Sequence, residues 1–122
     1  MYAKAGYYSY DESGICDMNI PVRIVSCGIF KPISRPDVLT IRTFGRKDYQ
    51  FIYVASGKVY FVVKEDEASG VSRTIEVEEG NGFLYRPGQK QHYYYRSCEN
   101  TSVYWMHFTG YKAIELINEC KV

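Results

Sequence analysis

The sequence is poor in the residues that build metal and redox sites. It contains only two histidines, and none of its four cysteines lies in a C-x-x-C pair. Zinc and dithiol centres need such donors at close spacing, so the sequence favours neither. The first ten residues also lack the apolar run of an export signal. We therefore expect a cytoplasmic protein whose cysteines are reduced thiols.

An excess of charge of one sign is also missing. Fifteen basic and fourteen acidic side chains leave a formal net charge of +1. DNA-binding surfaces are usually strongly basic, because much of their affinity comes from neutralising phosphates. We therefore expect that this chain does not bind promoter DNA by itself. No apolar stretch approaches the length of a membrane span, so we expect no membrane partner.

Aromatic residues are abundant, with 13 tyrosines, 6 phenylalanines and one tryptophan. Such residues suit pleated sheet surfaces, and they equally suit pockets that hold flat or sugar-like ligands. Composition leaves both uses open. The length of 122 residues is enough for one domain around one core.

Short extended runs separated by turn residues fill the chain between positions 21 and 109. We expect eight strands, at residues 22–30, 38–44, 49–55, 58–64, 73–77, 83–86, 92–97 and 102–109. Short strands at close, regular spacing are typical of an all-β sandwich or barrel.

The first twenty residues differ in composition from this series. They are rich in tyrosine and glycine, with a polar stretch at residues 11–14, and such a composition suits an arm or irregular segment better than a core strand. Two interpretations of this N-terminal arm stay open, a cover over the barrel mouth and simple disorder. The tyrosines available for a cover are Tyr2, Tyr7, Tyr8 and Tyr10.

The chain ends on a pattern of helical period. Ala113, Leu116, Ile117 and Cys120 stand at i, i+3, i+4 and i+7, which predicts a helix with one apolar face. Thr109 is the expected N-cap. We expect this short C-terminal helix to pack against the outside of the sandwich.

Three sequence blocks resemble a known family. Residues 80–92, GNGFLYRPGQKQH, resemble the second cupin motif, with a type II turn expected at Pro87-Gly88. Residues 40–57 and 102–110 resemble the first conserved block and the closing strand of AraC/XylS-type (arabinose-operon regulator-like) sensor domains. Residues 25–28 add a weaker early match. The resemblance covers about residues 22–118, and its blocks follow in the family's order.

This resemblance implies a cupin, a double-stranded β-helix jelly roll, over residues 21–109. It implies a sensor domain that binds a small effector, often a sugar, inside the barrel. Residues 110–122 would begin the linker and dimerisation helix of a homodimeric transcription regulator. DNA binding would belong to a C-terminal helix-turn-helix domain that this chain does not contain.

Metal-dependent cupin enzymes are the main alternative within the fold. They take two histidines and usually a glutamate from the first motif, but residues 47–57 contain neither type. We expect no metal, no other cofactor and no catalytic residue. His92 stands at the position of a metal ligand that has been lost, and we expect it to have a structural role. A free-standing, metal-independent sugar isomerase or epimerase stays open, with His92 or a tyrosine as acid and base.

Arg42 and Thr40 share one face of the strand expected at residues 38–44, away from Leu39 and Ile41. An arginine in such a place usually faces solvent, but one face of a small barrel can line a ligand cavity. The resemblance implies that Arg42 reaches a bound sugar, so we favour the cavity.

Four more residues complete the expected ligand site. The resemblance implies that Trp105 stacks on a sugar and that Tyr93 contacts it from the rim, although both residues could simply pack in a sheet. His107 follows Trp105 by two positions and lines the same cavity or packs in the core. Ser26 lies in the early matching block. Val103 stands where the family has a sugar-contacting histidine, so we expect an effector other than arabinose.

Overall fold

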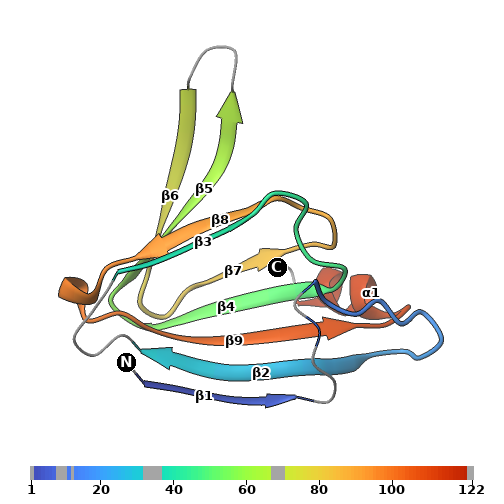
Figure 1. Cartoon of the computed structure of the whole chain (residues 1–122). Coiled ribbons are helices and arrows are strands. Elements are labelled where there is room, and N and C mark those ends of the chain that lie inside the picture. Colours follow the sequence, from blue (N-terminus) through green and yellow to red (C-terminus); the bar gives the residue numbers. More distant parts are fainter. Residues whose placement is uncertain (1, 8–10, 12, 32–36, 67–70, 121–122) are drawn as a thin grey trace.

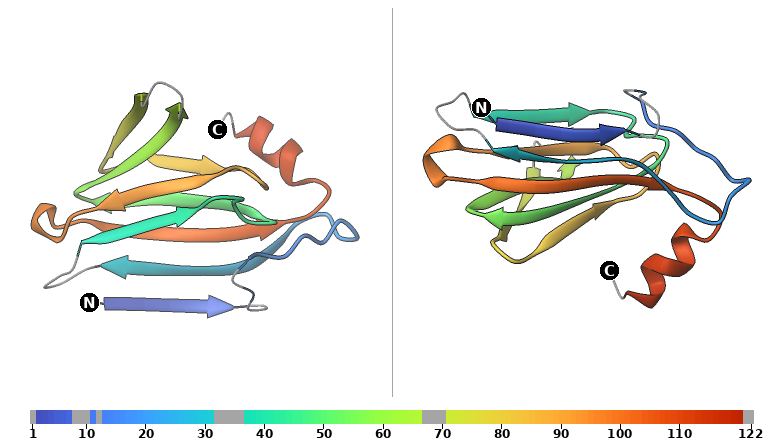
Figure 2. Two further views of the ribbon diagram at one scale, coloured as in Figure 1. Left: turned by 45° about the horizontal axis from the view of Figure 1, so that its top comes forward. Right: turned by 90° about the horizontal axis from the view of Figure 1, so that it is seen from below.

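The computed structural model describes residues 2–7, 11, 13–31, 37–66 and 71–120. Their strands form two antiparallel sheets stacked face to face (Figures 1 and 2). The five-stranded sheet has the order β1 (Tyr2–Tyr7), β2 (Arg23–Lys31), β9 (Ser102–Thr109), β4 (Tyr49–Ser56) and β7 (Gly82–Tyr85). The four-stranded sheet has the order β3 (Val38–Arg42), β8 (Gln91–Tyr95), β5 (Lys58–Asp66) and β6 (Val71–Glu78). The expected all-β jelly-roll sandwich is confirmed.

The core lies between the two sheets. Because successive side chains of a strand point to opposite faces, each strand gives alternate residues to this interior. The buried cluster is Ile52, Val54, Val59, Phe61, Val77, Tyr85, Tyr93, Tyr95 and Val103. The hairpin of β5 and β6 continues past the sandwich as a projection (Figure 1).

All eight expected strands are present, and the structure adds β1. This strand pairs with β2 along its whole length, from Tyr2 opposite Lys31 to Tyr7 opposite Ser26. The expectation of an irregular segment is therefore wrong for residues 2–7. The physical reason is that β2 would otherwise be an edge strand, and an unpaired edge accepts any extended segment within reach. Residues 8–10 and 32–36 lie outside the described parts of the chain.

The turn at Pro87-Gly88 has the expected geometry. Gly88 has a φ of 79°, and the Gln89 amide donates a hydrogen bond to the Arg86 carbonyl over 3.1 Å. A positive φ at the third turn position defines type II. The turn therefore reverses the chain between β7 and β8 as the cupin-like motif predicts.

Helix α1 (Ala113–Glu119) begins later than expected and has a different cap. Lys112 is its N-cap and makes no side-chain capping bond, so the prediction of Thr109 as the cap is wrong. Thr109 still belongs to β9, and its Oγ1 accepts a hydrogen bond from the Asp17 amide over 3.1 Å. The turn at Gly110, with a φ of 133°, separates strand from helix.

The helix packs on the outer face of the five-stranded sheet, as expected. Ala113 and Ile117 are buried there, in a cluster with Phe108, Tyr49, Phe51, Leu84 and Met106. Leu116 and Cys120 are exposed, so the apolar face is narrower than its spacing predicts. In the described part of the chain, no helix combines the length and apolarity needed to cross a membrane.

Candidate functional site

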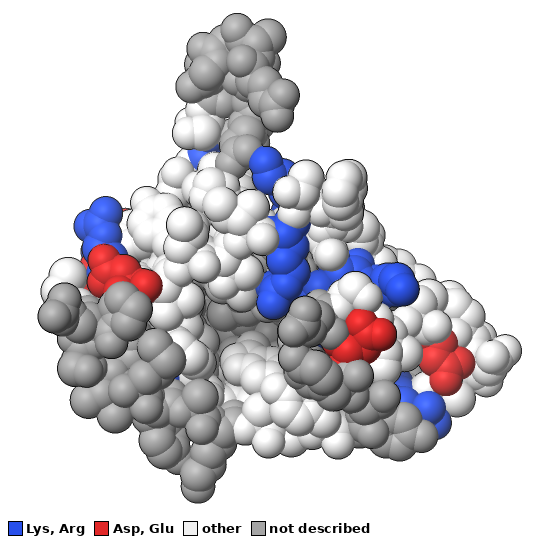
Figure 3. Space-filling model, in the orientation of Figure 1, with Lys and Arg blue, Asp and Glu red and all other residues white. Residues whose placement is uncertain are grey.

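A cavity of about 820 Å³ lies between the two sheets. Ligand pockets commonly measure roughly 300–1,000 Å³, so the space suits a small molecule. The cavity corresponds to a hollow between the layers in the surface view (Figure 3). Its lining includes all six residues proposed from the sequence, which are Ser26, Thr40, Arg42, Tyr93, Trp105 and His107.

These six residues come from both layers. Three of them face inward from the five-stranded sheet: Ser26 on β2, and Trp105 and His107 on β9. The other three face inward from the four-stranded sheet: Thr40 and Arg42 on β3, and Tyr93 on β8. A molecule in the cavity would therefore contact both sheets, and each sheet supplies a hydroxyl, an aromatic ring and a nitrogen-containing side chain.

Strand β3 carries its polar face inward. Leu39 is 63% exposed and Ile41 is 52% exposed, whereas Thr40 and Arg42 line the cavity. The alternative of a solvent-facing Arg42 is therefore wrong. Nη1 of Arg42 donates a hydrogen bond to Oε1 of Gln91 over 2.6 Å, which holds the guanidinium at the cavity wall.

Ser26 and His107 form a hydrogen-bonded pair at the opposite wall. Oγ of Ser26 lies 2.7 Å from Nδ1 of His107, and both residues are buried. The Trp105 ring lies beside the imidazole, with 5.0 Å between centroids. Burial lowers the pKa of His107 to about 4, and the positive charges of Arg46 and Arg42 also lower it, against the opposing effect of Asp48.

We expect His107 to stay neutral in the folded protein down to about pH 4. Because the unfolded chain takes up this proton near pH 6.5, the stability linked to His107 is complete above pH 6.5. It is lost as the pH falls through the window from about 6.5 to about 4. The loss is on the order of 3 kcal/mol. Measurement of the free energy of unfolding against pH, for wild type and His107→Gln, checks this: the variant should show a shallower decline.

An NMR titration of the imidazole measures the same property directly. The His107 resonance should keep its neutral position at pH 5.5, and its assignment follows from its loss in the His107→Gln spectrum. A midpoint near 6.5 would contradict the expected neutral, buried pair.

Tyr93 lies deeper than the sequence predicts. It is only 9% exposed and packs against Phe61, with 5.6 Å between ring centroids. The expected position at the rim is therefore wrong. The reason is that β8 lies in the interior of its sheet, between β3 and β5, so its inward side chains enter the core. The hydroxyl of Tyr93 accepts a hydrogen bond from Nε2 of Gln50 over 3.3 Å.

Two glutamines of the site were not predicted from the sequence. Gln50 is 3% exposed and Gln91 is fully buried, and both lie on inward positions of their strands. Oε1 of Gln50 and Nε2 of Gln91 have no hydrogen-bond partner among the described residues. A buried polar atom without a partner costs free energy, and Gln50 lines the cavity. Its oxygen is therefore ready to accept a hydrogen bond from a ligand.

His92 does not lie where a lost metal ligand would be expected. It follows the buried Gln91 on β8, pairs across the ladder with Ile41, and is absent from the cavity lining. The assignment of His92 to the ligand position is therefore wrong. His92 stands one position later after Pro87-Gly88 than the histidine of the common cupin motif, and a shift of one residue along a strand turns a side chain to the opposite face. The acid-base role considered for His92 in an isomerase loses its structural basis.

A buried ion pair supports the mouth of the cavity. Nε and Nη2 of Arg46 donate to the two carboxylate oxygens of Asp48 over 2.8 and 3.2 Å, and both side chains are almost fully buried. Asp48 also accepts a hydrogen bond from the Ile15 amide over 3.1 Å, and the Lys47 amide donates to the Ser13 carbonyl over 2.8 Å. These bonds fasten part of the N-terminal segment to the loop before β4.

The fastened segment reaches the cavity. Asp11 and Ser13 belong to its lining, as does Tyr7 at the end of β1, whose ring centroid lies 6.4 Å from that of Trp105. Of the two interpretations of the arm, the covering one fits these described residues. Tyr8 and Tyr10 lie outside the described residues, as does the side chain of Tyr2.

Metal-binding groups are few around the cavity. Among the described residues there is no group of three or more His, Cys, Asp or Glu side chains placed to hold a metal ion. The described lining residues contribute one imidazole, His107, and one carboxylate, Asp11. The cavity offers instead hydroxyls, amides, a guanidinium and aromatic rings, which are groups suited to binding by hydrogen bonds and stacking.

Several solved structures resemble this chain weakly. A cupin domain of an XRE-family transcriptional regulator from Enterobacter cloacae aligns over 88% of this chain and 94% of its own, with 17% identity and a TM-score of 0.48. An oxalate oxidase in complex with the substrate analogue glycolate aligns over 71% of this chain and 40% of its own, with 14% identity and a TM-score of 0.40. No curated protein matches the sequence.

A family model matches most of the sequence. The match is to the AraC-like ligand binding domain and extends over residues 36–121. It includes β3 to β9 and α1, and so contains the whole four-stranded wall of the cavity together with Trp105 and His107. The chain belongs to the family of AraC-like ligand-binding domains.

Proposed function

We propose that the cavity binds a small, carbohydrate-like effector and that this chain is the sensor of an AraC-type transcription regulator. The observation that carries the proposal is one cavity that places an indole ring on the sheet opposite a guanidinium and a hydroxyl. Trp105 lies on one sheet, and Thr40 and Arg42 lie on the other. In this proposal residues 21–109 sense the effector and residues 110–122 begin the dimerisation linker.

Sugar chemistry matches these walls. A sugar ring has one face of C–H groups, which an indole ring covers, and an edge of hydroxyls, which need both donors and acceptors. Arg42 supplies donors, while Oε1 of Gln50 is a buried acceptor with no partner among the described residues. Thr40 and Ser26 add hydroxyls to the lining.

The proposal assigns a regulatory role and no catalytic one. A general base acts best when its pKa lies near the working pH, and burial holds the pKa of His107 at about 4. Burial also raises the pKa of Tyr85 and Tyr95 above the ordinary value. Effector binding would instead control DNA binding by a separate C-terminal domain, in a homodimer.

We expect Trp105→Ala to weaken effector binding about five- to hundred-fold, because it removes one stacking contact of about 1–3 kcal/mol. A thermal-shift screen of sugars identifies the ligand, and calorimetry on wild type and variant measures the loss. Tyr104→Ala is the matched control, since Tyr104 immediately precedes Trp105 on β9 and is 51% exposed on the outer face.

The control should bind like wild type, and both variants must first show a wild-type circular dichroism spectrum. Equal affinity of wild type and folded Trp105→Ala would contradict the proposed site. If no sugar in the screen binds, the carbohydrate function itself is wrong.

A further inference from the structure

We infer that the effector is a sugar acid whose carboxylate pairs with Arg42. This inference rests on the proposed carbohydrate function, and it names the charge that distinguishes the ligand. It follows from the contacts of Arg42 in the cavity, compared with those of the ion-paired Arg46 and Arg23.

Arg42 has no acidic partner among the described residues. Its one described contact is the hydrogen bond from Nη1 to the neutral amide of Gln91. A guanidinium has five N–H donors in a planar fork, so most of its donors are unused. By contrast, Arg46 is paired with Asp48 at 2.8 Å and Arg23 with Asp17 at 3.4 Å.

Among the described residues, the other charged groups of the cavity do not neutralise Arg42. Asp11 is exposed and accepts hydrogen bonds from the amide and hydroxyl of Ser13, over 2.9 and 2.7 Å. Its pKa is lowered mainly by these bonds, with smaller effects from Lys47 and Arg46. Asp48 is already bound to Arg46. Within the described part of the chain, the half-buried guanidinium of Arg42 therefore lines the cavity without a compensating negative charge.

Such a charge favours an anionic ligand group. A cation held away from water is costly unless it is paired, and a carboxylate fits the guanidinium fork with two parallel hydrogen bonds. Gln91 accepts a hydrogen bond from only one of the guanidinium nitrogens, Nη1, and this bond anchors the guanidinium at the cavity wall. A neutral sugar hydroxyl would take one hydrogen bond and leave the charge uncompensated, so the cavity is better matched to the acid.

The ring of the same ligand has its own contacts elsewhere in the cavity. Trp105 and Ser26 lie on the opposite sheet from Arg42, and Gln50 lies on the strand beside β9. Phe30 and Val38 add an apolar surface at the far end of β2 and β3. A carboxylate at Arg42 therefore leaves the sugar ring between the sheets, where the proposed stacking and hydroxyl contacts lie.

The test compares each acid with neutral sugars of the same shape. D-galacturonate, its methyl ester and D-galactose form one set, and D-glucuronate, its methyl ester and D-glucose form the second, each titrated by calorimetry. We expect wild type to bind one of the acids about ten- to hundred-fold more tightly than its methyl ester, because a charge-assisted hydrogen bond contributes about 1.5–3 kcal/mol.

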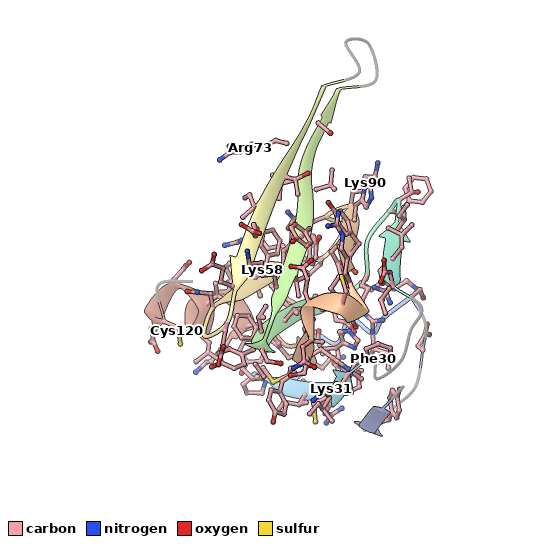
Figure 4. The ribbon with its side chains drawn as sticks, turned by 90° about the vertical axis from the view of Figure 1, so that its left-hand side faces the viewer. Phe30, Lys31, Lys58, Arg73, Lys90 and Cys120 are labelled. Atoms are coloured by element: carbon pink, nitrogen blue, oxygen red, sulfur yellow. The ribbon has the colours of Figure 1, made fainter. Side chains whose placement is uncertain are left out.

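Three variants separate the effect of the guanidinium's two-pronged hydrogen bonding from the effect of its positive charge. Arg42→Gln should lose the preference for the acid and bind acid and ester alike, while Arg42→Lys, which keeps the charge without the fork, should retain part of it. Arg73→Gln is the matched control. Arg73 is exposed on β6, and its side chain points away from the sandwich (Figure 4), so the same loss of charge there should leave the preference unchanged.

The outcomes distinguish the two proposals. If neutral sugars bind wild type as tightly as their acids, or if folded Arg42→Gln keeps the preference, the inference of an anionic effector is wrong and the carbohydrate function stands. If neither the acids nor the neutral sugars bind, the carbohydrate function is wrong and the inference falls with it.

Discussion

Asp48→Asn should lower the free energy of unfolding by about 3–5 kcal/mol. Asp48 is buried and pairs with Arg46, whose guanidinium is also buried. The substitution removes the carboxylate charge from this buried pair, and breaking a buried ion pair from one side is costly. The substitution also weakens the acceptor that holds the Ile15 amide. Urea denaturation followed by circular dichroism measures the change.

The matched control is Asp17→Asn, which breaks the ion pair with Arg23 at 3.4 Å. Both partners of that pair are partly exposed, and such pairs contribute about 0–1 kcal/mol. A loss of less than 1 kcal/mol in Asp48→Asn, or equal losses in both variants, would contradict the assigned role of the buried pair.

Phe61→Ala should lower the free energy of unfolding by about 3–5 kcal/mol, because it leaves a cavity in a closely packed cluster. Phe61 is fully buried, stacks on Phe83 with 4.1 Å between ring centroids, and supports the Tyr93 ring that lines the ligand cavity. We therefore expect weaker effector binding as well as lower stability. Thermal and urea denaturation give the first quantity and calorimetry the second.

Phe44→Ala provides the comparison for this substitution. Phe44 is 88% exposed, so its removal should change stability by no more than about 0.5 kcal/mol. A Phe61→Ala variant as stable as Phe44→Ala would show that the packing between the sheets is not the main source of stability.

Alternation along strands predicted much of this molecule. It placed Thr40 and Arg42 on one face of β3, and Trp105 with His107 on one face of β9, and the structure has these residues in one lining. The same rule could have found Gln50, because Gln50 alternates with the apolar Ile52 and Val54 of β4. Gln91 likewise alternates with Tyr93 on β8.

Features that lie outside periodic segments, or that depend on contacts distant in sequence, could not be predicted from alternation. The pairing of Asp48 with Arg46 lies in a loop, where no periodicity marks a residue as buried. The strand β1 forms because β2 offers an edge, not because of its own composition. The burial of Tyr93 depends on the position of β8 inside its sheet, and the true cap of α1 depends on where β9 ends.

The indole resonance of Trp105 tests the central claim most directly. The chain has one tryptophan, so an ¹⁵N-labelled sample gives a single indole N–H cross-peak, and this reporter lines the cavity. Titration with the tightest-binding sugar of the calorimetric screen should move that peak, with the same affinity that calorimetry gives. A sugar that binds by calorimetry but leaves the indole peak unmoved at saturation would contradict binding between the sheets.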